Sequence, residues 1–158
     1  HSYFCLDNSG DIKAHELQIM TDKYLPTDED VIPTGEIKNV AKTNFDFRKF
    51  RTLGDYPYDH NFCFQESPRL KKLASVRSQL SNLSVSVYST APGLQLYTGH
   101  NIHIPENFRG EKGFGPYSGL CLEPQIWPDS PNNCTFPSAV LRPNEIFRQS
   151  SVFEFDWL

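Results

Sequence analysis

The stretch Leu83-Ser84-Val85-Ser86-Val87 alternates apolar and polar residues without a break. Successive side chains of an extended chain point to opposite faces, so the apolar side chains share one face and the serines share the other. This pattern predicts a β-strand with one face against a core. A second alternation, with Phe153, Phe155 and Trp157, predicts a strand over residues 151–158 that buries its aromatic face.

The composition extends this expectation to the whole chain of 158 residues. Aromatic residues make up 13% of it, 12 prolines punctuate it, and it has one methionine. Aromatic and β-branched residues favour strands, and prolines mark the turns between them. We therefore expect an all-β fold, a sandwich of antiparallel sheets that forms a single domain over residues 1–158.

Shorter strands are expected from the same patterns in residues 1–6, 15–22, 36–40, 45–47 and 60–65. One segment differs, because Leu70, Leu73, Ala74 and Leu80 lie near helical spacing. The sequence therefore predicts a helix over residues 70–80 as the exception in a β-structure.

The charge and the cysteines limit the partners and the compartment. A formal charge of −4 without a basic block argues against nucleic acid or an anionic membrane as a partner. No apolar run approaches the roughly 20 residues of a spanning helix. The four cysteines (positions 5, 63, 121 and 134) lack CxxC spacing, so no metal site is expected. Cys63 and Cys121 lie in apolar runs typical of buried thiols. We expect four thiols and a reducing, cytoplasmic location.

Glu123 is the strongest candidate for chemistry, because Leu122 and Pro124 flank it. Apolar surroundings disfavour the charged carboxylate and raise its pKa, which suits a general base at neutral pH. Gln125 and Trp127 follow, and an amide beside a flat ring suits a sugar, which has apolar faces and hydroxyl edges. The competing interpretation is an ordinary strand glutamate that faces solvent.

Three other polar residues stand beside aromatics at expected strand ends, namely His1, Asp59 and Gln95. Histidine is the side chain suited to act as acid or base near neutral pH, and carboxylates and amides hydrogen-bond hydroxyls. Each residue taken alone is more often structural than functional. Together they predict a site that binds hydroxyls and moves protons.

Five motifs give this set a specific pattern: His1-Ser2-Tyr3-Phe4, Ile32-Pro33-Thr34-Gly35-Glu36-Ile37, Tyr58-Asp59-His60-Asn61-Phe62, Pro92-Gly93-Leu94-Gln95-Leu96-Tyr97-Thr98-Gly99 and Cys121-Leu122-Glu123-Pro124-Gln125. In this order they resemble the aldose 1-epimerases (galactose mutarotases), and they extend over most of the chain. The resemblance implies a β-supersandwich and the interconversion of the α- and β-anomers of an aldohexose such as glucose or galactose, without a cofactor.

The resemblance also implies roles for single residues. His1 matches the general acid and Glu123 the general base, while Asp59 and Gln95 match residues that bind sugar hydroxyls. The base takes the proton of the C1 hydroxyl, the acid protonates the ring oxygen, and the ring opens and closes again. The expected partner is a small aldose; the pattern leaves the preferred aldose and the oligomeric state open.

The sequence departs from the family pattern in two ways. Cys5 and His100 stand where the resemblance leads us to expect asparagine. Family members also extend considerably further on the N-terminal side, where an arginine and a second histidine bind the sugar. We therefore expect the chain to be the C-terminal portion of such a protein, N-terminally truncated at the catalytic acid. Taken alone, it is expected to show little or no epimerase activity.

Other functions stay open at this point. A sugar-binding protein without turnover would keep the same ligands. An N-terminal histidine can bind copper together with a second histidine, as in some polysaccharide monooxygenases on a β-sandwich. The candidate second ligands are His15, His60, His100 and His103. A relative that acts on hexose 6-phosphates is disfavoured, because no cluster of Arg and Lys is evident for the phosphate.

Overall fold

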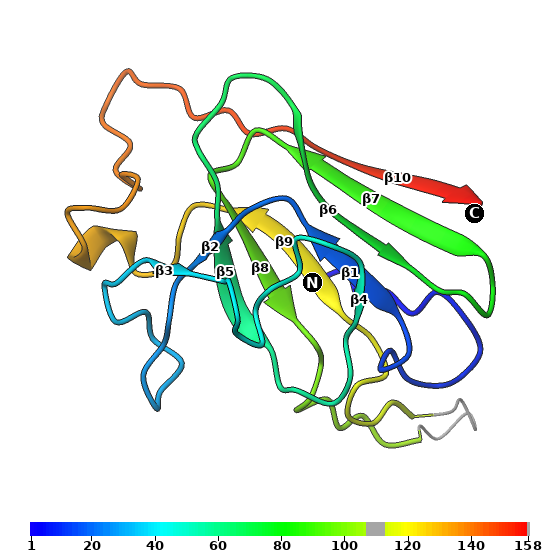
Figure 1. The fold of residues 1–158 in the computed structure, drawn as a ribbon. Helices are drawn as coiled ribbons and strands as arrows, with labels where there is room; N and C mark the ends of the chain where they lie inside the picture. Colours follow the sequence, from blue (N-terminus) through cyan, green and yellow to red (C-terminus); the bar gives the residue numbers. More distant parts are fainter. Residues whose placement is uncertain (107–112, 158) are drawn as a thin grey trace.

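The computed structural model describes residues 1–106 and 113–157, and its regular structure is almost entirely β (Figure 1). The elements in chain order are β1 (Glu16–Ile19), β2 (Lys23–Tyr24), β3 (Lys38–Asn39), β4 (Arg51–Thr52), β5 (Asp59–Cys63), β6 (Lys71–Arg77), β7 (Leu83–Ser89), β8 (Gly93–Tyr97), β9 (Cys121–Gln125), the short 3-10 helix η1 (Ser130–Asn132) and β10 (Ser151–Trp157). The expectation of an all-β chain is confirmed.

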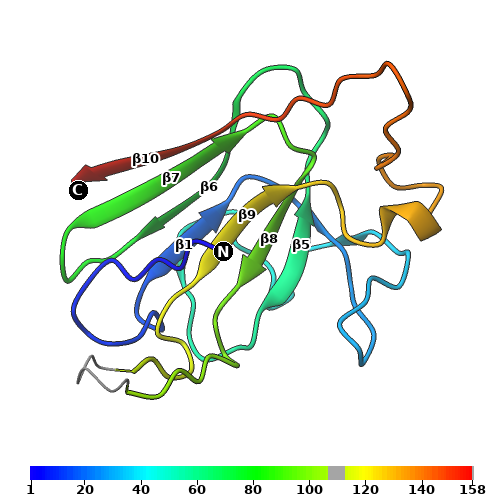
Figure 2. The same ribbon diagram turned by 180° about the vertical axis from the view of Figure 1, so that it is seen from behind.

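The strands form two five-stranded sheets, with the orders β10-β7-β6-β1-β4 and β3-β2-β5-β8-β9. Every strand pair in them is antiparallel. Figures 1 and 2 show β10 at the outer edge of its sheet, reached by a long segment that runs on from η1. None of the helices in residues 1–106 and 113–157 is long and apolar enough to cross a membrane.

The larger of two apolar clusters among the described residues joins the two sheets. It contains Val76, Val85 and Val87 from one sheet and Phe62, Leu94, Leu96 and Leu122 from the other, together with residues of the connecting loops. The inward residues of β5, β8 and β9 carry even numbers, so their odd-numbered neighbours face away from the core. This alternation leaves one face of the second sheet free for polar side chains.

The predicted helix over residues 70–80 is wrong, because β6 occupies most of that segment between β1 and β7. Four consecutive residues, Leu73 to Val76, are buried, and the pairing with β7 shifts between Lys72 and Ala74. Such a bulge brings adjacent residues inward and breaks the period of two. The broken period imitated helical spacing, whereas Leu70 and Leu80 are exposed.

The terminal strand exists as β10, although residue 158 lies outside the described part of the chain. Its aromatic face is not buried as expected: Phe155 is 63% and Trp157 is 72% exposed. Phe153 packs on the core. Because β10 is the edge strand of its sheet, its C-terminal end extends beyond the core. The expected strand at residues 45–47 is a loop.

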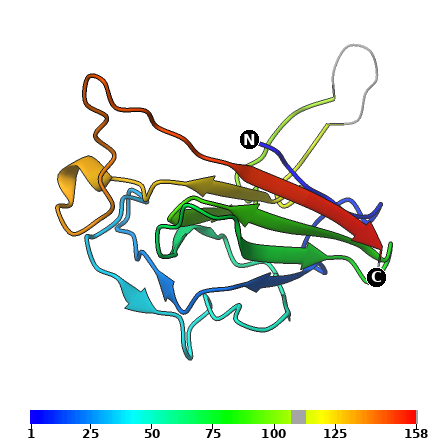
Figure 3. The same cartoon turned by 90° about the horizontal axis from the view of Figure 1, so that it is seen from above.

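The N-terminal segment forms one isolated bridge, between Phe4 and Leu120, instead of the strand expected over residues 1–6. Two backbone hydrogen bonds of 2.8 and 3.0 Å hold these residues together. Figure 3 shows the N-terminus on the same side as the segments that leave β8 and enter β9. The bridge therefore fixes where His1 lies relative to β9.

Candidate functional site

The register of β5, β8 and β9 arranges the polar side chains of the outward face in rows. One row contains Asp59, Tyr97 and Cys121, and the next contains Asn61, Gln95 and Glu123. Directly opposite side chains on neighbouring strands lie close enough to interact. Three predicted site residues, from segments far apart in the sequence, therefore meet on one sheet face.

This face forms the floor of an open cleft of about 540 Å³. The loop between β2 and β3 and the N-terminal segment form its walls. The residues that line the cleft are His1, Tyr3, Leu25, Thr27, Val31, Pro33, Asp59, Asn61, Gln95, Tyr97, Asn101, Glu123, Gln125 and Pro128. All four residues predicted for the site are among them. The described lining contains no lysine or arginine, so the cleft suits an uncharged ligand better than a sugar phosphate.

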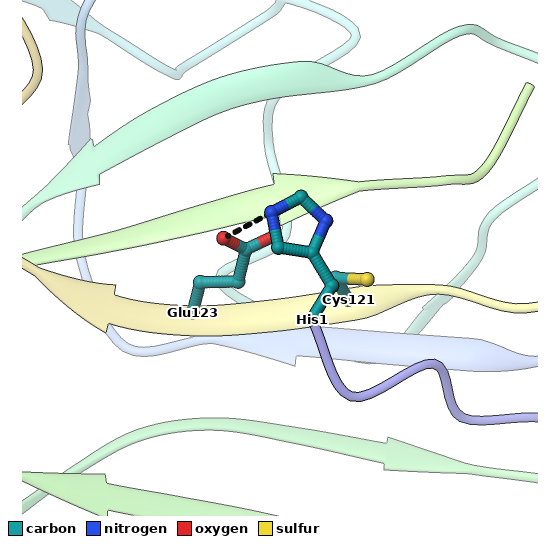
Figure 4. Close-up of side chains that lie close together, drawn as sticks. All are labelled: His1, Cys121 and Glu123. Carbon is teal, nitrogen blue, oxygen red and sulfur yellow. Dashed lines mark ion pairs between the residues drawn. The ribbon is translucent and has the colours of Figure 1, made fainter. Parts of the chain in front are cut away.

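His1 and Glu123 lie directly beside each other. The Nε2 atom of His1 is 3.6 Å from Oε2 of Glu123, and Figure 4 shows the imidazole lying over β9 toward this carboxylate. Burial raises the pKa of Glu123; the neighbouring N-terminal amine opposes this rise, and the charge of Asp59 adds to it. The raised pKa is the one expected from its apolar neighbours in the sequence.

Asp59 and Gln95 form the second predicted pair. The Nε2 atom of Gln95 donates a hydrogen bond of 2.7 Å to Oδ1 of Asp59. The Oε1 atom of the same amide is buried and has no hydrogen-bond partner in the described structure. The pair therefore offers a charged acceptor and a free amide oxygen to a ligand in the cleft.

Tyr3 and Asn61 are among the cleft residues that the sequence did not single out. Tyr3 places its hydroxyl 3.4 Å from Nδ1 of His1, and Asn61 lies buried beside Gln95. The period of a strand was the signal that could have found Asn61, because it shares a face with Asp59 two residues earlier. Tyr3 likewise follows His1 by two residues, in the segment held by the bridge at Phe4.

Trp127 is not among the described residues that line the cleft, contrary to the expectation of a sugar platform. Its Nε1 atom donates a hydrogen bond of 2.6 Å to the carbonyl of Pro92, and its ring packs edge-on against Phe136. These contacts place Trp127 in a small second core with Leu25 and Cys63. It supports the floor of the cleft from one side.

Two groups of side chains have the chemistry of metal ligands in the described residues. One is His1, Cys121 and Glu123, in which burial raises the pKa of the Cys121 thiol to about 12. No second histidine belongs to this described group, so the copper arrangement considered from the sequence gains no support. All four cysteines are free thiols, as expected.

The other group is Cys5, Asp7 and His15. The backbone N–H of Leu6 donates to Nε2 of His15 at 2.8 Å, so the proton of the neutral ring resides on Nδ1, the nitrogen nearer Asp7. A protonated nitrogen cannot bind a metal ion. This cluster, in which His15 is buried and Cys5 is exposed, is therefore a structural contact of the N-terminal segment.

The contact between His1 and Glu123 lies beside the pair Asp59 and Gln95, in a polar cleft on the open face of an antiparallel sheet. The profile of the family described as aldose 1-epimerase matches residues 1–154. The chain belongs to this family, and its fold is the galactose mutarotase-like β-supersandwich.

Similar proteins agree in sequence and in structure. The chain is 45% identical to a mouse galactose mutarotase and 37% identical to an Escherichia coli aldose 1-epimerase, over 98% of its own length in both cases. A GalM/aldose epimerase homologue from C. elegans superposes with a TM-score of 0.88 at 26% identity, over 99% of this chain and 50% of that one. The chain spans about half the length of the curated relatives it matches, 48% and 49% in these two cases.

Proposed function

We propose that the cleft interconverts the α- and β-anomers of an aldohexose by general acid–base catalysis. The observation that carries this proposal is the contact between His1 and Glu123, 3.6 Å apart, at the side of a cleft lined with hydroxyl-binding groups. The names of the relatives, galactose mutarotase and aldose 1-epimerase, support the same chemistry.

The spacing of the pair suits the reaction. The hydroxyl oxygen at C1 and the ring oxygen are bonded to the same carbon, so neighbouring groups can serve both. Glu123 takes the proton of the C1 hydroxyl, and His1 gives a proton to the ring oxygen as the C1–O bond of the ring breaks. Rotation about C1–C2 and the reverse steps give the other anomer. Because the two side chains are in contact, we place both of them at one edge of the sugar.

Asp59 and Gln95 hold the sugar while these protons move. Their hydrogen bond leaves one Asp59 oxygen and the Gln95 Oε1 atom available for hydroxyls of the substrate. No step of this reaction requires a metal ion or an organic cofactor. The partner is thus a small aldose, and the cleft favours an uncharged one.

We further propose that residues 1–158 act as one domain, because a single core cluster includes strands of both sheets. The four free thiols, two of them buried, support a reducing compartment such as the cytoplasm.

The decisive experiment is Glu123→Gln in the full-length protein, followed by polarimetry of freshly dissolved α-glucose and α-galactose. Glutamine keeps the shape of the side chain but cannot take a proton, so kcat should fall by roughly 10²–10⁴-fold while sugar affinity stays within a few-fold. Glu29→Gln, at an exposed position outside the cleft, is the matched control and should turn over normally. Sugar binding without measurable turnover in the unchanged protein would instead identify a sugar-binding protein.

A further inference from the structure

The floor of the cleft contains a second amide that the proposed mechanism does not use. Asn61 lies on β5 directly opposite Gln95 on β8, which in turn lies opposite Glu123 on β9. The row thus runs from an amide, through another amide, to the proposed base. Asn61 is 1% exposed and still lines the cleft.

The nitrogen of the Asn61 amide is bound inside the protein. Its Nδ2 atom donates to the carbonyl oxygen of Phe62 at 3.3 Å and lies 3.9 Å from Sγ of Cys63. A rotated amide would aim its oxygen at the Phe62 carbonyl, so that two acceptors would face each other. The neighbouring acceptor therefore fixes which way the amide points.

The oxygen of the same amide is left without a partner. Oδ1 of Asn61 is buried and accepts no hydrogen bond in the described structure, and Oε1 of Gln95 is in the same state. Buried acceptors without donors are rare because they cost free energy, and they call for an explanation. Both residues line one cleft, and sugar hydroxyls are donors of the required kind.

The backbone beside Asn61 leaves room for this oxygen. A Cβ atom on Gly93, two residues before Gln95 on β8, would lie 2.5 Å from Oδ1 of Asn61 and 2.9 Å from the ring of Trp127. Any larger residue would press on the oxygen from the strand beside it. Glycine at this position keeps the acceptor free of that contact.

We propose that Asn61 determines sugar specificity, its Oδ1 atom accepting a hydrogen bond from one hydroxyl of the aldose while Oε1 of Gln95 accepts from another. This assignment rests on the proposed sugar-converting function, and it makes the two amides a paired acceptor for a ring with two suitably placed hydroxyls. A sugar that lacks one of them leaves a buried oxygen unpaired.

The test measures equilibrium affinity in the full-length protein by titration calorimetry. The ligands are glucose, galactose and derivatives that each lack one ring hydroxyl. The unchanged protein should bind the derivatives lacking either contacted hydroxyl about three- to tenfold more weakly. Asn61→Ala should bind the parent sugar weaker by a similar factor, and should show no further loss for the one derivative that lacks the partner of Asn61.

Asn8→Ala is the matched control, since this amide is exposed and lies outside the described lining of the cleft. It should keep the pattern of losses of the unchanged protein. Equal weakening of every ligand by Asn61→Ala would show a merely structural role and overturn the proposal. So would an unchanged protein that is indifferent to every missing hydroxyl, a result that decides even if the alanine variant does not fold.

Turnover is measured by polarimetry on the same samples. If the unchanged protein shows the predicted affinity pattern but no turnover, the proposed function is overturned and the role of Asn61 is not. The reverse result, normal turnover without coupling between Asn61 and any hydroxyl, would overturn only this inference.

Discussion

The cleft face of β5, β8 and β9 and the aromatic face of β10 are both open in the described residues, yet they differ in chemistry. The first presents carboxylates and amides, two of them with free buried oxygens. The second presents Phe155 and Trp157, 63% and 72% exposed. A polar open face fits a small hydroxylated ligand, whereas an apolar one fits protein surface. An exposed face therefore fits a small ligand in the sheet of β5, β8 and β9, and protein surface in the sheet of β10.

The largest expected effect compares one phenylalanine from each region. Phe62 is fully buried in the shared core, and Phe62→Ala should lower the free energy of unfolding by about 3–5 kcal/mol. Phe155→Ala in the same 158-residue chain should change it by less than about 1 kcal/mol, because its ring is mostly in water. Urea denaturation followed by circular dichroism measures both.

The same pair sharpens the comparison in longer forms of the protein. A much larger cost of Phe155→Ala there than in the 158-residue chain would mean that a further segment covers β10. Equal and small costs in both forms would contradict the view that this face fits protein surface.

A third region is polar but buried away from the cleft, so a substitution there tests the effect of burial on stability apart from ligand binding. His15 is fully buried, accepts a hydrogen bond from the N–H of Leu6, and lies 3.8 Å from Asp7. His15→Ala leaves that buried N–H without an acceptor and should cost about 1–3 kcal/mol of stability, with no direct effect on sugar affinity. His103→Ala, at an exposed position, is the control and should cost little.

The pH dependence of stability follows from the same histidine. Burial lowers the pKa of His15 in the folded state. Below its ordinary value of about 6.5 the unfolded chain binds a proton that the folded chain refuses, so stability should fall as the pH drops below that value. Thermal melts from pH 7.5 to 5 should show this slope in the unchanged protein and a shallower one in His15→Ala. An identical slope in both would exclude His15 as its source.

The sequence predicted the strands that alternate regularly, and it failed where the period of two breaks. The alternating serines and valines of β7 predicted a strand correctly, whereas the bulge in β6 produced a spacing that resembled a helix. The aromatic residues of β10 predicted a strand but not the exposure of its side chains, because burial depends on which strand forms the edge of the sheet. Edge position is set by pairing between distant segments, which local periodicity does not contain.

The site was predictable to a similar extent. The five motifs supplied the four candidate residues, and the structure places all of them on one cleft. Strand periodicity puts Asn61 on the same face as Asp59, but only the folded surroundings show that its amide oxygen is buried and unpaired. It also misplaced Trp127, whose indole N–H is bound by the Pro92 carbonyl at a distance in sequence of 35 residues.

Within the cleft, Asp59 and Gln95 should behave as one unit because a hydrogen bond of 2.7 Å joins them. Each alanine variant should raise KM about tenfold, the loss expected for a hydrogen bond that involves a charged group. The double variant should lose clearly less than the product of the single losses, because each single change already disrupts the pair. Strictly multiplicative losses would mean that the two side chains bind the sugar independently.

The smallest expected effect is a shift of the pH–rate profile caused by the charge of Asp59. Burial is the main reason that the pKa of Glu123 is raised, and the negative charge of Asp59 raises it further. The general base is active without its proton, so turnover falls as the pH drops through this pKa. Asp59→Asn removes the charge and lowers the pKa of Glu123. It should move the acidic limb of the pH–rate profile to lower pH by less than about one unit, because the charges act across the intervening strand β8.

Gln95→Ala is the control, since it breaks the same hydrogen bond but keeps the Asp59 carboxylate. The acidic limb of this variant should stay where it is in the unchanged protein. Polarimetry across pH 4 to 8 measures all three proteins. A shift toward higher pH in Asp59→Asn, or complete loss of the limb, would show that Asp59 itself carries a proton in the reaction and that the two carboxylates have been assigned the wrong roles.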